Sequence, residues 1–148
     1  MNSITTHWMD DNERGAVLVE FALVLPLLLV LFAGMFDLGL AFQRYQAVTN
    51  AAREGARMAV LPGYSTAEVE SRVRNYLAAS GVPGTPTIVV SQITMTPVGG
   101  GTLFTAKKVH VQVTHVFTVL GPIATLVGGT FGAVALTSES IMRIEVAS

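Results

Sequence analysis

The sequence of 148 residues has no cysteine and few charged side chains. The absence of cysteine excludes disulfides, cysteine-based metal sites and a thiol nucleophile. Charged residues make up 13% of the chain, whereas soluble domains carry about 25%. The formal net charge is −1 at pH 7, so the basic face that a nucleic-acid partner would require is not expected.

Histidines are also scarce, and their spacing argues against a shared metal site. The chain has His7, His110 and His115. His110 and His115 are an odd number of positions apart, so strand alternation places them on opposite faces of a sheet. Neither a nucleophile elbow nor a phosphate-binding loop is present in the sequence. We therefore expect no enzymatic activity, no cofactor and no small-molecule substrate.

Apolar residues, in contrast, make up 51% of the chain, and many lie in one N-terminal run. Residues 16–36 read AVLVEFALVLPLLLVLFAGMF and contain a single charge, Glu20. A helix of this length spans about 31 Å, which matches a bilayer core of roughly 30 Å. We therefore predict that residues 16–36 form a membrane-spanning helix.

Two alternatives to a membrane span are a buried helix of a soluble protein and a secretory signal peptide. A buried helix rarely runs this long without a polar face. The segment before the run is acidic, with Asp10, Asp11 and Glu13 against Arg14. The run is also longer than the apolar core of a signal peptide, which has about 7–15 residues. These features favour the membrane span.

Glu20 requires an explanation, because a carboxylate in hydrocarbon is costly unless it lies near the interface or is paired. One explanation is that Glu20 lies one turn inside the membrane and reaches the headgroups. The other is a cationic partner. A cut after Gly15 would make Ala16 the new N-terminus and Glu20 the fifth residue, so the amine of one subunit would neutralise Glu20 of a neighbour.

The residues around this site resemble the cleavage motif of type IV prepilins, with Arg14-Gly15, four apolar residues and then Glu20. Residues 13–60, which include ERGAVLVEFALVLPLLLVLF and AVTNAAREGARMAV, resemble the TadE-like proteins of tight-adherence (Flp) pilus systems. The resemblance implies a minor pilin or pseudopilin in the bacterial inner membrane, cut between Gly15 and Ala16. The implied partners are other pilins and minor pilins, the prepilin peptidase, the inner-membrane pilus assembly platform and membrane lipid.

Charge and resemblance disagree about the orientation of the chain across the membrane. The positive-inside rule counts Lys and Arg near the ends of a span. Arg14 precedes the run, and Arg44, Arg53 and Arg57 follow it. Charge alone would therefore place the C-terminal part in the cytoplasm. The resemblance implies a periplasmic C-terminal part, and this is the orientation that we predict.

The sequence predicts an α+β chain with four parts. With the orientation that the resemblance implies, these are a cytoplasmic leader (1–15), the membrane segment (16–36), a periplasmic extension of the same helix (37–60) and a small periplasmic α+β domain (61–148). Alanine and long polar residues favour a helix from about residue 17 to residue 60, before Pro62 and Gly63. Its predicted apolar stripe consists of Phe42, Tyr45, Val48 or Thr49, Ala52 and Ala56.

The remaining sequence predicts a short helix followed by about three antiparallel strands. The helix covers residues 66–79, with Ser65 or Thr66 as its cap. The strands cover residues 87–94, 107–120 and about 134–146. In the second strand, alternation places Val109, Val111 and Val113 on one face and His110, Gln112 and Thr114 on the other.

Two further features suggest contact surfaces. Arg53 and Arg57 share one helix face, which is either a solvated face or a contact with a partner subunit or with the protein's own domain. Residues 120–136 carry no charge, and their glycines disfavour a second membrane helix, so we predict a buried or partner-facing loop. This loop supports an alternative function, a membrane-tethered periplasmic binding domain that never enters a filament.

Overall fold

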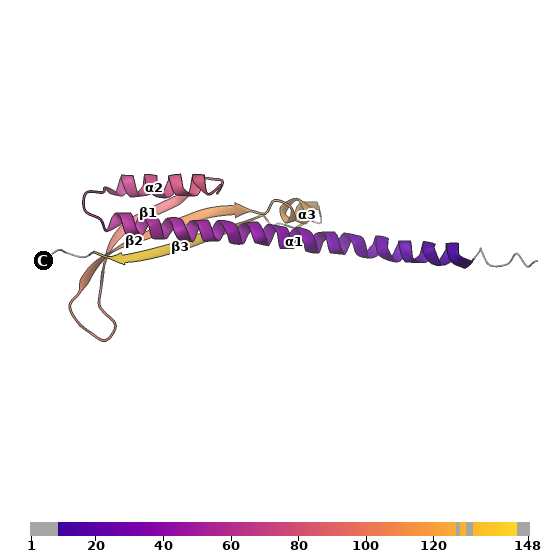
Figure 1. Cartoon of the computed structure of the whole chain (residues 1–148), viewed down its shortest axis with the longest axis horizontal. Coiled ribbons are helices and arrows are strands. Elements are labelled where there is room, and N and C mark those ends of the chain that lie inside the picture. Colours follow the sequence, from indigo (N-terminus) through magenta and orange to yellow (C-terminus); the bar gives the residue numbers. More distant parts are fainter. Residues whose placement is uncertain (1–8, 127, 130–131, 145–148) are drawn as a thin grey trace, which may run out of the picture.

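The structure is a computed structural model that describes residues 9–126, 128–129 and 132–144. Its elements are, in order, α1 (Met9–Ala59), α2 (Thr66–Ala79), β1 (Thr87–Met95), β2 (Phe104–Val116), α3 (Leu120–Leu126) and β3 (Ala133–Arg143). Figure 1 shows the two longer helices on one side of the sheet, with α3 beside α1 at one end of it. The predicted α+β class, with a long helix, a short helix and three antiparallel strands, is confirmed.

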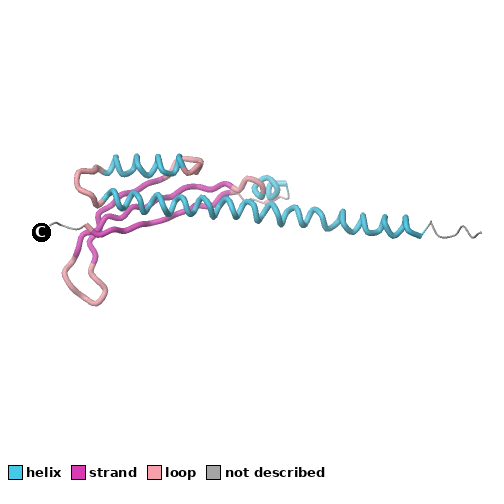
Figure 2. Tube along the Cα trace, viewed as in Figure 1, coloured by secondary structure: helices cyan, strands magenta, loops and turns pink. Residues whose placement is uncertain are grey.

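The 51 residues of α1 form one helix whose two halves have different surroundings (Figure 2). The N-terminal half extends away from every other element, and its apolar side chains are exposed, as at Leu23 (75%) and Leu27 (71%). The half that follows Phe36 packs against the sheet and α2. The helix begins at Met9, earlier than the predicted residue 17, and it continues through Pro26.

Helix α2 has both predicted ends, because its signals are local. Ser65 is the N-cap, and its hydroxyl accepts the Glu68 N–H at 3.4 Å. The Glu68 carboxylate accepts the Ser65 N–H at 2.8 Å, which completes a capping box. Gly63, with φ +93°, makes the turn between α1 and this cap, a conformation that favours glycine.

The sheet has the order β1-β2-β3, and both pairs are antiparallel. Val109 lies opposite Val90 on one side and Ser140 on the other. The predicted alternation of β2 is confirmed, because Val109, Val111 and Val113 are buried while His110 is half-exposed. On that outer face, His110 and Lys108 both contact Glu139, at 2.9 and 2.8 Å.

One core joins the second half of α1 to α2 and the sheet. Its buried members are Val48, Ala51, Ala52 and Ala56 from α1, Val69, Val73 and Leu77 from α2, Val82, and Ile88, Val109, Val111 and Val113 from the sheet. Gly55 lies where the three parts meet, since a Cβ there would be 2.6 Å from Val73 Cγ2 and 3.2 Å from Val109 Cγ1. Small residues on α1 therefore set how closely the layers approach.

The predicted apolar stripe on α1 is partly wrong. Val48, Ala52 and Ala56 are buried, but Phe42 and Tyr45 are 63% and 44% exposed. The buried face instead continues from Val48 towards Asp37, which is fully buried. The residues that pack closest to the sheet are small, so large aromatic side chains are turned away from it.

The predicted second and third strands differ from β2 and β3 at their ends. The strand predicted to reach residue 120 ends at Val116. The Phe117 N–H still bonds to Gly132 O, but the N–H groups of residues 118–120 bond to Asp37 rather than to a neighbouring strand. The predicted loop at residues 120–136 contains α3, a connection and the start of β3. The last strand, predicted for about residues 134–146, covers Ala133–Arg143, and Ile144 is already outside it; residues 145 and 146 lie outside the described residues.

Candidate functional site

The residues of the predicted cleavage site lie on the N-terminal half of α1, which extends away from the other elements and which we call the free half. Gly15 and Ala16 are both exposed, and a Cβ at Gly15 would meet nothing within 4 Å. Glu20 follows on the same helix and is also exposed. Among the residues whose side chains are described, none forms an ion pair with Glu20. A cationic partner for Glu20 would have to come from outside this set.

The helix that carries these residues is apolar enough to cross a membrane. Within Gly15–Ala59, an 18-residue window has a mean hydropathy of 2.7, and none of that window is buried. Its length and its exposed apolar side chains fit a bilayer or a bundle of similar helices. The structure therefore has one N-terminal helix, among the described residues, that is able to span a membrane.

Asp37 joins the end of this apolar run to the connection between β2 and α3. Its carboxylate accepts the N–H groups of Thr118 (3.2 Å), Val119 (2.9 Å) and Leu120 (2.7 Å). Sequence reasoning interpreted Asp37 only as the end of the apolar run and missed this role. One signal for this role was present in the sequence. Asp37 lies two turns before Arg44, so the two opposite charges share one face of the helix.

The environment of Asp37 favours its charged form. Burial alone would raise the pKa of this carboxyl group, because it removes the carboxylate from water. The hydrogen bonds from Leu120, Val119 and Thr118, with the nearby His115, act in the opposite direction and outweigh burial. The net result is a pKa below the ordinary value, so Asp37 is an anion at neutral pH.

Arg44 and His115 extend this site towards the sheet. The Arg44 Nη1 group donates to His115 Nδ1 at 2.7 Å, and His115 is only 1% exposed. Burial and the Arg44 charge lower the pKa of His115, although Asp37 acts to raise it. His115 is therefore neutral, with its proton on Nε2, which has no described hydrogen-bond partner. We call Asp37, Arg44 and His115 the junction cluster.

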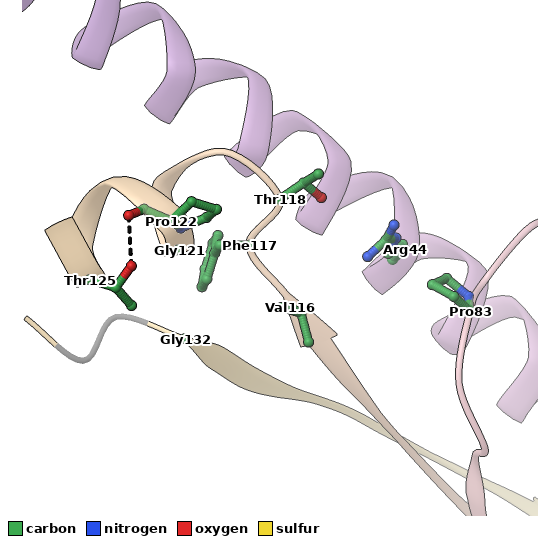
Figure 3. A pocket seen from close by; sticks show the side chains of 9 residues that line it. All are labelled: Arg44, Pro83, Val116, Phe117, Thr118, Gly121, Pro122, Thr125 and Gly132. Atoms are coloured by element: carbon green, nitrogen blue, oxygen red, sulfur yellow. Dashed lines mark hydrogen bonds between the residues drawn. The ribbon is translucent and has the colours of Figure 1, made fainter.

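An apolar pocket of about 790 Å³ lies beside the junction cluster. Figure 3 shows Arg44 from α1, Phe117 from the β2–α3 connection and Pro122 from α3 around it. Phe117 packs edge-on against the His115 ring, with centroids 5.1 Å apart. The pocket suits an apolar group beside one guanidinium. No cluster of three potential metal ligands occurs among the described residues.

Arg53 and Arg57 lie apart from the junction cluster, further along α1, and both are exposed. Arg57 lines a second pocket of about 400 Å³ together with Tyr64 and Arg72. Glu54 pairs with Arg72 of α2 at 3.0 Å, so this carboxylate links the two helices. A contact of Arg53 and Arg57 with a partner subunit stays a prediction.

Comparison with known proteins gives a match to part of the free half of α1 and most of its packed half. A family model described as TadE-like protein matches residues 15–57. This confirms the resemblance to the TadE-like family, and the match ends before α2. No curated protein and no solved structure matches the chain.

Proposed function

We propose that this chain, TadE-like over residues 15–57, is a minor pilin or pseudopilin of a tight-adherence type IVb pilus. The apolar half of α1 anchors it in the bacterial inner membrane, and the sheet lies in the periplasm. The prepilin peptidase cuts between Gly15 and Ala16. The mature chain then acts in pilus assembly or secretion with other pilins and the assembly platform.

The TadE-like match over the exposed half of α1 carries this proposal. A helix with apolar side chains on all sides is stable in lipid and equally able to pack against similar helices. Cleavage would place an ammonium group four residues from Glu20. A neighbouring subunit offers its own ammonium group to that carboxylate, which removes the cost of an unpaired charge in hydrocarbon.

The mass of the mature chain tests the proposal. Co-expression with a prepilin peptidase should yield a chain that begins at Ala16, and Gly15→Val should leave residues 1–15 attached. Gly39→Val is the matched control, because Gly39 lies on the same helix with open space around it. Cleavage should be unaffected in the control. A wild-type chain that still begins at Met1, or one that begins at Phe42, would contradict the proposal.

The apolar pocket beside Arg44 supports a second candidate, a membrane-tethered periplasmic binding domain that never enters a filament. The two candidates differ in what they require of Glu20. A filament subunit with Glu20→Ala should still reach the membrane but should no longer co-purify with other pilins. A tethered binding domain should keep both its localisation and its activity with this substitution.

A further inference from the structure

Helix α3 is held at the level where the apolar run of α1 ends. The Asp37 carboxylate accepts N–H groups from the residues that lead into α3, and a Cβ at Gly34 would lie 3.9 Å from Leu120 Cδ1. Figure 1 shows α3 at the end of the sheet nearest the free half of α1, with the β1–β2 hairpin at the opposite end. With residues 16–36 in a bilayer, α3 therefore lies at the membrane interface.

Helix α3 and the neighbouring end of β2 carry no charge, and several of their side chains are exposed. No charged residue occurs from Val116 to Ser138 in the sequence. Leu126 is 90% exposed, Val116 is 58% exposed, and Pro122 is also exposed. Large apolar side chains exposed together usually mark a contact surface. The absence of charge favours a partner that is itself apolar at this depth.

We propose that α3 is a second membrane contact, inserted at the boundary between headgroups and acyl chains of the outer leaflet. The inference rests on the anchoring of α1 in the proposed function. The occupant is lipid because α3 lies beside the last turns of the apolar run of α1, and at this level Met35, Phe36 and Leu38 are exposed, at 60%, 60% and 62%. Apolar faces of interfacial segments enter this boundary to a depth of about 5–10 Å.

Two membrane contacts would fix the orientation of the sheet relative to the bilayer. A single helix allows the domain to rotate about the helix axis, whereas α3 defines which side of α1 faces the leaflet. Asp37 transmits this restraint, because it ties α3 to the last turns of the span. The outer face of the sheet is then presented to partner subunits in one direction.

Depth-dependent fluorescence quenching tests this inference on the full chain. Trp8 is the only tryptophan, so Trp8→Phe gives a silent background. Three single-tryptophan variants are compared, Leu126→Trp on α3, Leu27→Trp in the span and Val98→Trp at the β1–β2 hairpin, all at exposed positions. Each variant is reconstituted, at a high lipid-to-protein ratio, in phosphatidylcholine–phosphatidylglycerol vesicles. One set of vesicles contains lipids with acyl chains brominated near the headgroup (shallow bromines), and the other contains lipids with chains brominated near their ends (deep bromines).

The inference expects Leu126→Trp to lose most of its emission to shallow bromines and less to deep ones. Leu27→Trp should be quenched most by deep bromines, and Val98→Trp by neither. Should Leu126→Trp behave like Val98→Trp while Leu27→Trp is quenched, the α3 contact is wrong and the anchor stands. Loss of quenching at Leu27→Trp would remove the anchor itself.

A second outcome separates lipid from protein as the occupant. A blue-shifted emission at Leu126→Trp without bromine quenching would mean that another copy of the chain covers α3, which overturns the inference. A spin label on Leu126→Cys, with its accessibility to oxygen and to a water-soluble nickel complex, repeats the test without a bulky indole. High oxygen and low nickel accessibility are expected there, and the reverse at Val98→Cys.

Discussion

Asp37 is the residue that joins the end of the apolar run of α1 to the folded part of the chain. A buried carboxylate that accepts three backbone N–H groups holds the segment that ends β2 and begins α3. An asparagine at this position would offer a single acceptor oxygen and place an amide donor against those N–H groups. We therefore expect Asp37→Asn to lower the free energy of unfolding by about 2 kcal/mol, within the usual range for hydrogen bonds to a charged group.

Urea unfolding of the detergent-solubilised chain, followed by circular dichroism, measures this loss. Glu70→Gln is the matched control, because it makes the same chemical change on α2, away from the junction cluster. Its effect should stay within about 0.5 kcal/mol. Hydrogen exchange should also accelerate at the amides of residues 118–120 in the Asp37 variant alone. Equal stability of the two variants would show that Asp37 does not hold the connection.

His115 makes the junction cluster sensitive to acid. Its pKa is lowered in the folded chain by burial and by Arg44, so the unfolded chain binds a proton that the folded chain does not. The stability that neutral His115 contributes is complete above the ordinary pKa of 6.5 and is lost as the pH falls through the lower, folded value. Asp37 adds a second loss below its ordinary pKa of 3.8, since its folded pKa is also lowered.

The pH dependence of the urea midpoint separates the two groups. His115→Gln should remove the loss that begins below pH 6.5 and should leave the later loss due to Asp37. His110→Gln is the control, because His110 lies on the outer face of β2 and pairs with Glu139. The His110→Gln variant should keep the wild-type decrease of the urea midpoint below pH 6.5 that is attributed to His115. An unchanged pH profile for His115→Gln would remove His115 from this account.

Among the elements, those with local signals could be predicted from the sequence and those with distant determinants could not. Ser65 and Glu68 lie three positions apart, and they define the start of α2 without help from the rest of the chain. The end of β2 depends on a carboxylate 81 to 83 positions earlier in the chain. No pattern within residues 107–120 reports this interaction, so the alternation of β2 was extended too far.

The same distinction applies to the candidate site. Gly15 and Glu20 can be proposed from the sequence because their spacing within one helix is the signal itself, and their roles in cleavage and pairing stay predictions. The junction cluster was missed because its members come from α1 and β2, and only folding brings them together. The predicted apolar stripe of α1 wrongly includes Phe42 and Tyr45, which are exposed. Hydrophobicity alone favours aromatic residues in the buried face, whereas close packing against a sheet requires small ones.

Gly55 sets the distance between α1, α2 and the sheet. A Cβ here would approach Val73 to 2.6 Å, and Val73 is fully buried. Replacing glycine by alanine in a helix gains about 1 kcal/mol, while overpacking costs about 1–3 kcal/mol. We expect overpacking to win, because the contact is to a branched buried side chain. Gly55→Ala should therefore lower the free energy of unfolding by about 1 kcal/mol.

The matched control for this element is Gly39→Ala on the same helix. A Cβ at Gly39 would meet nothing within 4 Å, so only the helix preference acts there. Gly39→Ala should leave the urea midpoint unchanged or raise it. A stabilised Gly55→Ala variant would mean that the layers separate readily, and that Gly55 does not limit their approach.

At the scale of the whole molecule, the charge distribution and the proposed function predict opposite orientations. Arg44, Arg53 and Arg57 follow the span, which favours a cytoplasmic sheet by the positive-inside rule. Arg44, however, donates to His115 within the folded module, so its guanidinium is held by the protein rather than free to interact with the membrane surface. We expect the sheet to be periplasmic, as in the proposed pilin.

Single-cysteine labelling decides between these orientations, because the chain has no cysteine of its own. Val98→Cys, at the exposed β1–β2 hairpin, should react with a membrane-impermeant maleimide in intact spheroplasts. Asn2→Cys, in a host without the prepilin peptidase, should react only after lysis. The opposite pattern would show that the arginines after the span set the orientation, and it would rule out periplasmic assembly, since the sheet would then lie on the side of the membrane away from the growing filament.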